Sequence, residues 1–85
     1  MNMQEIADKC EKKFLEKIEE KMGDSSVVPL PVIKRYCRML TIYCDSEGKV
    51  TESFIKSMEK CIEEIKSIEG MDEIFDECNQ CPEES

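Results

Sequence analysis

The chain has 85 residues, of which 40% are hydrophobic and 38% are charged, with a net charge of −8 and neither histidine nor tryptophan. This balance suits one small, soluble, helix-rich domain better than an intrinsically disordered chain. The lack of histidine removes the most common general base and the most common metal ligand. No apolar run reaches the roughly 18 residues that a membrane-spanning helix needs.

The first predicted helix covers residues 3–22. Asn2, followed three residues later by Glu5, fits a capping box at its start, and Gly23 is a natural C-terminal cap. Apolar residues recur on one helical face, namely Met3, Ile6, Ala7, Cys10, Phe14, Ile18 and Met22. Segment 24–31 cannot continue this helix, because its two prolines restrict the residues before them to extended conformations.

Two further helices follow. Pro31 suits the first position of a helix, whose inward side would carry Ile33, Tyr36, Cys37, Leu40, Tyr43 and Cys44. Residues 45–48 form a predicted turn, and Thr51 is the expected cap of the third helix. Residues 50–69 carry the widest apolar stripe of the chain: Phe54, Ile55, Met58, Cys61, Ile62, Ile65 and Ile68.

These elements predict an all-α fold. Short connections between three amphipathic helices favour a three-helix antiparallel bundle, in up-down-up order, over residues 1–70. Residues 71–85 are expected to form a short fourth helix, or an acidic C-terminal tail, that packs on the same domain or extends from it.

The negative charge is concentrated near the end of the chain. Residues 59–85 hold ten acidic side chains against Lys60 and Lys66, and no basic residue follows Glu69. Such a surface repels nucleic acids and anionic membranes and attracts basic protein surfaces. A solvated, solubilising surface is the simpler interpretation. The candidate partner-binding residues are Glu63, Glu69, Asp72, Glu73, Asp76 and Glu77.

Six cysteines are the only chemically distinctive feature. If the helices alternate in direction, Cys10 lies level with Cys44, and Cys37 lies level with Cys61. Two cross-helix disulfides therefore fit the predicted bundle. The alternative is that these four cysteines are buried free thiols that pack as small hydrophobic side chains.

Cys78 and Cys81 form a C-x-x-C pair, which is the usual half of a zinc or iron–sulfur site. The chain offers no second half, so a complete site would need two chains that meet at these residues. Thioredoxin-like catalysis is disfavoured, since nearby carboxylates and a helix C-terminus raise the pKa of Cys78. We otherwise expect no cofactor.

No nucleophile–base pair or phosphate-binding loop is present, so we expect a protein that is not an enzyme. The favoured function is a small protein-binding module, such as a regulator, adaptor or inhibitor, that uses its acidic surface against a basic partner. The alternatives are a thiol or metal protein that uses Cys78 and Cys81, and a homodimer formed through the stripe of residues 50–69. Since no signal peptide is seen, we expect the cytoplasm; oxidised cysteines would instead indicate secretion or a thermophile's cytosol.

Overall fold

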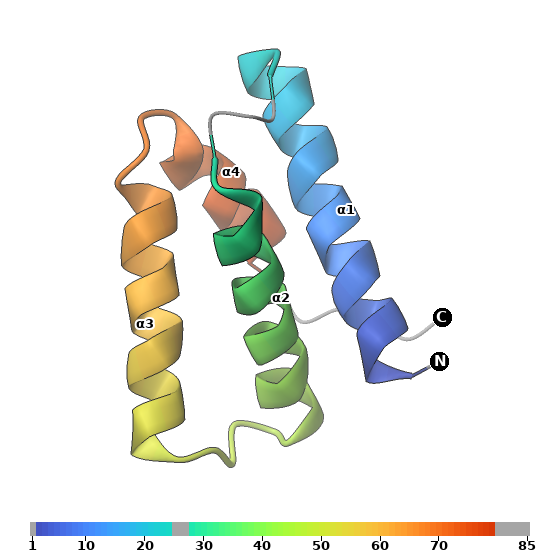
Figure 1. Cartoon of the computed structure of the whole chain (residues 1–85), viewed down its shortest axis with the longest axis vertical. Coiled ribbons are helices and arrows are strands. Elements are labelled where there is room, and N and C mark those ends of the chain that lie inside the picture. The colour runs from blue at the N-terminus through green and yellow to red at the C-terminus, as the bar shows by residue number, and fades with distance from the viewer. Residues whose placement is uncertain (1, 25–27, 80–85) are drawn as a thin grey trace.

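The computed structural model describes residues 2–24 and 28–79 and contains four helices (Figure 1). They are α1 (Met3–Met22), α2 (Leu30–Asp45), α3 (Glu52–Lys66) and α4 (Met71–Cys78). Within these two ranges there is no strand, so the predicted all-α class is confirmed. None of the described helices combines the length and apolar character that crossing a membrane requires.

Helices α1 and α3 begin at the caps that the sequence predicts. The Asn2 side chain accepts a hydrogen bond of 2.9 Å from the backbone N–H of Glu5. The Thr51 hydroxyl accepts one of 3.2 Å from the backbone N–H of Phe54. These contacts satisfy backbone donors that the first turn of a helix leaves without a partner.

The cap of α3 gives a first testable prediction. Thr51→Ala removes the acceptor for the Phe54 N–H and should lower the free energy of unfolding by about 1 kcal/mol. Urea denaturation followed by circular dichroism measures the change. Ser57→Ala is the matched control, because Ser57 is an exposed residue within the same helix, and it should change stability by less than about 0.5 kcal/mol. Equal losses in both variants would contradict the capping role.

Two helix ends differ from the prediction. Helix α2 begins at Leu30, so Pro31 occupies its second position. Helix α3 ends at Lys66, before the apolar stripe does, and the chain turns through Ser67–Gly70 into α4. Gly70 has φ 91°, a left-handed conformation that glycine adopts without steric cost. Its backbone therefore permits the reversal that directs α4 back onto the other helices.

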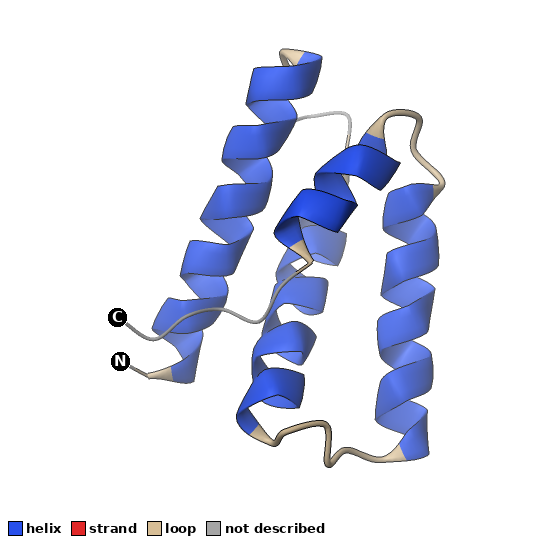
Figure 2. Cartoon of the chain, turned by 180° about the vertical axis from the view of Figure 1, so that it is seen from behind, coloured by secondary structure: helices blue, strands red, loops and turns tan. Residues whose placement is uncertain are grey.

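Helix α4 belongs to the core. Helix α2 packs between α1 and α3, while α4 packs against both α1 and α3. Figure 2 shows α4 lying across this layer of three helices. Its apolar residues, Met71, Ile74, Phe75 and Cys78, are all buried. The sequence left a helix and a tail open as alternatives, and the structure shows the helix over residues 71–78.

Three aromatic rings from three helices meet at the centre. The Phe14 ring packs edge-on against Tyr36, with the ring centroids 6.1 Å apart, and lies 6.4 Å from Phe75. The Tyr36 and Phe75 rings are 5.2 Å apart. The Tyr36 hydroxyl donates a hydrogen bond to Oδ1 of Asn79, which satisfies the polar end of a buried ring. This cluster joins α1, α2 and α4.

The apolar stripe of residues 50–69 is used mainly within the chain. Met58, Cys61 and Ile65 are buried, and Phe54, Ile62 and Ile68 pack against the core. Ile55 remains exposed. The stripe therefore finds its cover in α2 and α4 of the same chain.

Candidate functional site: the acidic side of α4

Helix α4 has two chemically distinct sides. Residues 71, 74, 75 and 78 face the core, whereas the four acidic residues of the helix are exposed: Asp72, Glu73, Asp76 and Glu77. The spacing i, i+1, i+4, i+5 places all four carboxylates on one half of the helix surface. We call these four residues the acidic side of α4. Because the opposite half is buried, the helix is held in a fixed orientation.

Two lysines from neighbouring helices flank this surface. The Lys21 ammonium on α1 donates a 3.1 Å hydrogen bond to the Glu77 carboxylate, and this contact raises the pKa of Lys21. The Lys66 ammonium on α3 lies 5.1 Å from the centroid of the Phe75 ring. Within the described residues, Glu77 is thus the one member of the acidic side that forms an ion pair.

The other two predicted partner-binding residues lie outside α4. Glu63 is an exposed residue of α3, and Glu69 is exposed in the turn before α4. The structure therefore gathers four of the six predicted residues on one helix. The sequence could show their helical spacing, but only the fold shows that the reverse of α4 is buried.

No family model, curated protein or solved structure matches the chain. The arguments about function therefore rest on the site itself.

The cysteines are arranged differently from the two predicted cross-helix pairs. Cys10, Cys37, Cys61 and Cys78 are free, buried thiols. Neither Cys10–Cys44 nor Cys37–Cys61 is therefore present as a disulfide. Instead, the thiols of Cys10 and Cys37 form a hydrogen-bonded pair. Cys10, Cys37 and Cys61 therefore agree with the alternative interpretation, in which cysteines pack as small hydrophobic residues, whereas the fourth cysteine of that set, Cys44, is half-buried and disulfide-bonded.

The register between α1 and α2 explains the first correction. Two adjoining grooves between these antiparallel helices show the register. One is lined by Met3 and Ala7 of α1 and by Arg38 and Ile42 of α2, and the next by Ala7 and Glu11 of α1 and by Lys34 and Arg38 of α2. In this register Cys10 lies level with Arg35. Cys44 is nine residues farther along α2, or about 13 Å at 1.5 Å per residue. That separation is about twice what a disulfide spans.

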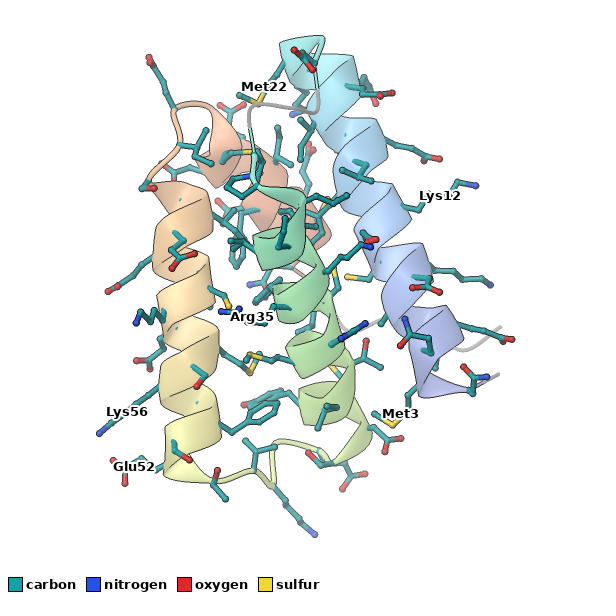
Figure 3. The ribbon with its side chains drawn as sticks, viewed as in Figure 1. Met3, Lys12, Met22, Arg35, Glu52 and Lys56 are labelled. Atoms are coloured by element: carbon teal, nitrogen blue, oxygen red, sulfur yellow. The ribbon has the colours of Figure 1, made fainter. Side chains whose placement is uncertain are left out.

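The predicted pairing of Cys10 with Cys44 requires the end of α1 and the start of α2 to lie at nearly the same level. In the structure α1 extends beyond the start of α2 by about seven residues, or about 10 Å (Figure 1). This extension of α1 provides residues that contact α4. Met22, labelled in Figure 3, approaches Gly70 at the start of α4, and Lys21 pairs with Glu77. The register thus follows from packing against an element that the sequence could not position.

The second predicted pair fails because of direction rather than level. The groove between α2 and α3 places Val32 beside Ile65 and Pro29 beside Ile68, so Cys37 and Cys61 do lie at nearly the same height. However, the strongest influence on the pKa of Cys37 is Cys10 on α1, whereas the guanidinium of Arg35 lowers the pKa of Cys61. Figure 3 shows Arg35 reaching from α2 toward α3. Burial raises the pKa of Cys61.

Cys78 is a core residue of α4. Burial raises the pKa of its thiol, which agrees in direction with the sequence argument, and Lys13 and Lys17 of α1 act in the opposite sense. Cys81, its predicted partner at a metal site, lies outside the described residues. Among the residues that the structure describes, no three cysteine, aspartate or glutamate side chains are arranged to hold a metal ion.

Proposed function

We propose that this protein is a small non-catalytic protein-binding module that presents the acidic side of α4 to a basic site on its partner. One observation carries the proposal: α4 buries every apolar residue it has and exposes only carboxylates on its other half. In the architecture that we propose, α1, α2 and α3 form an up-down-up bundle, and α4 lies across it as the recognition element.

A protein is a better partner for this surface than a nucleic acid or a membrane. Four carboxylates within two helical turns repel phosphates and attract arginine and lysine side chains, with which they form charge-assisted hydrogen bonds. Since the helix is already ordered by its buried half, binding requires little loss of conformational entropy. A regulator, adaptor or inhibitor that acts in the cytoplasm would use such a preformed surface.

The proposal predicts where a basic peptide binds. An oligo-lysine peptide, titrated into the 15N-labelled protein, should shift backbone amide signals mainly over residues 71–78. The affinity should fall about tenfold between about 0.05 and 0.3 M salt, because the contacts are exposed charge pairs. Binding that is unchanged across this range, or shifts that are centred on other helices, would contradict the proposed surface.

Charge-matched variants separate this site from the general acidity of the chain. Asp72→Asn, Glu73→Gln and Asp76→Asn together remove three charges from α4 and leave the Glu77–Lys21 ion pair intact. This variant should bind the peptide about tenfold more weakly. The control combines Glu16→Gln, Glu19→Gln and Glu59→Gln, which change the net charge equally at exposed positions on α1 and α3. Equal losses in both variants would show that only net charge matters.

A further inference from the structure

Two buried thiols meet where α1 packs on α2. Cys10 and Cys37 belong to the same core cluster, and in the register of the two helices Cys10 lies within two residues of the level of Cys37. Their thiols form a hydrogen-bonded pair. The acidic side of α4 consists of carboxylates and has no thiol. The cysteine pair is therefore a chemical feature separate from the proposed binding surface.

The two sulfur atoms are not equivalent. Cys10 is 7% exposed and has Lys13 nearby on α1, whereas Cys37 is completely buried. The hydrogen bond from Cys37 and the positive charge of Lys13 lower the pKa of Cys10. The same hydrogen bond and burial raise the pKa of Cys37. Cys10 is therefore the residue that more readily forms a thiolate and that a small reagent reaches first.

We propose that Cys10 and Cys37 form a redox-active dithiol, which hydrogen peroxide oxidises to a disulfide between α1 and α2. The thiolate of Cys10 attacks one peroxide oxygen, which breaks the O–O bond and releases hydroxide, and Cys10 becomes a sulfenic acid. The sulfur of Cys37 then attacks the sulfur of Cys10 and displaces the hydroxyl group as water. The two thiol protons end in two water molecules, and the two electrons from sulfur reduce the peroxide.

The pairing follows from the fold rather than from the spacing of cysteines in the sequence. The register brings Cys37 to Cys10 and keeps Cys44 about 13 Å away along α2. Cys61 contacts Arg35 on another side of α2. Cys78, the remaining free thiol of the described residues, is close enough for its charge to affect Cys37 and for the charge of Cys10 to affect it, but the hydrogen bond joins Cys10 to Cys37.

The test maps the bond directly. The folded protein, without added reductant, is treated with hydrogen peroxide, alkylated in denaturant and digested with trypsin. Cleavage after lysine and arginine places Cys10 in peptide 10–12, Cys37 in 36–38, Cys44 in 39–49, Cys61 in 61–66, and the last two cysteines in 67–85. A new species that joins peptides 10–12 and 36–38, and disappears after dithiothreitol treatment, is the expected result. Linkage of peptide 10–12 to any other peptide overturns the proposal, as does full alkylation of both residues after peroxide treatment.

Two variants assign the roles. In Cys37→Ser the sulfenic acid on Cys10 has no thiol to react with, so dimedone labelling of peptide 10–12 should rise at least several-fold over the parent protein. Cys61→Ser is the matched control, since it removes a buried thiol outside the pair, and it should leave the 10–12/36–38 linkage unchanged. Unchanged dimedone labelling in Cys37→Ser would overturn the order of attack. The mapping in the unmodified protein tests the pairing even if a variant fails to fold.

Discussion

Replacing Phe14 with alanine is expected to cause a large loss of stability and a lower midpoint of thermal unfolding. Phe14 is completely buried and contacts the rings of Tyr36 and Phe75, so its loss opens a cavity at the point where three helices meet. Truncating a buried phenylalanine costs about 3–5 kcal/mol. An 85-residue domain has a total stability of only about 4–13 kcal/mol. Thermal unfolding followed by circular dichroism measures the effect.

The adjacent residue supplies the control for this prediction. Leu15 is half-buried on α1 and lies outside the core cluster, so Leu15→Ala should cost about 1 kcal/mol. Phe14→Leu keeps most of the buried volume and should fall between the two alanine variants. If Phe14→Ala and Leu15→Ala lower the midpoint of unfolding equally, the ring cluster is not the centre of the core.

The loss should be greatest at α4. An isolated helix of eight residues is unstable in water, so α4 depends on the contacts of Phe75 with Phe14 and Tyr36. In Phe14→Ala, hydrogen exchange should accelerate first in residues 71–78, and peptide binding at the acidic side should weaken along with it. The proposed binding surface therefore depends on a residue of α1 that lies far from it in the sequence.

Local structure was predictable where local chemistry determines it. The caps at Asn2 and Thr51 and the left-handed Gly23 follow from short-range hydrogen bonding and backbone conformation, and the structure confirms them. The end of α3 was not predictable in this way. Apolar spacing continues to Ile68, but Ile68 belongs to the turn, where its carbonyl accepts a hydrogen bond from the N–H of Met71.

Long-range register was the main error. The sequence shows that Cys10, Cys37 and Cys61 face a core, but not how far α1 slides along α2. That offset is set by α4, which needs the last turns of α1 for Met22 and Lys21 to reach it. Because of this offset, the cysteine of α2 nearest the level of Cys10 is Cys37 rather than Cys44. For the same reason, the sequence could list the acidic residues of α4 but could not show which surface they would form.

The buried thiols also make stability depend on alkaline pH. Cys37, Cys61 and Cys78 have raised pKa values in the folded protein: Cys37 chiefly through its hydrogen bond with Cys10, the other two through burial. In the unfolded chain a thiol titrates near pH 8.5. Above that pH the native state binds more protons than the unfolded state, so the free energy of unfolding falls as the pH rises. Below about pH 8.5 the contribution of these three thiols is fully present.

The free energy of unfolding should therefore fall between pH 8.5 and 9.5, by at most about 1 kcal/mol for each of the three thiols. The lowered pKa of Cys10 acts in the opposite sense, but only below pH 8.5, where the unfolded thiol is still protonated. Tyr36 adds to the loss at higher pH, because burial raises its pKa as well. Urea denaturation in anaerobic buffer at the two pH values measures the change without oxidising the thiols.

A variant assigns the pH dependence to the cysteines. Cys61→Ala removes one of the three titrating thiols, so the loss between pH 8.5 and 9.5 should be smaller than in the parent protein. Cys61 lies outside the Cys10–Cys37 pair, so the substitution leaves the hydrogen bond between those thiols in place. A stability that stays constant from pH 8.5 to 9.5 in the parent protein would mean that the thiols are open to water in solution. Oxidation of Cys10 and Cys37 to a disulfide would remove the titration of Cys37. Peroxide-treated protein should therefore lose less free energy of unfolding between pH 8.5 and 9.5 than reduced protein, so this measurement also tests the proposed dithiol.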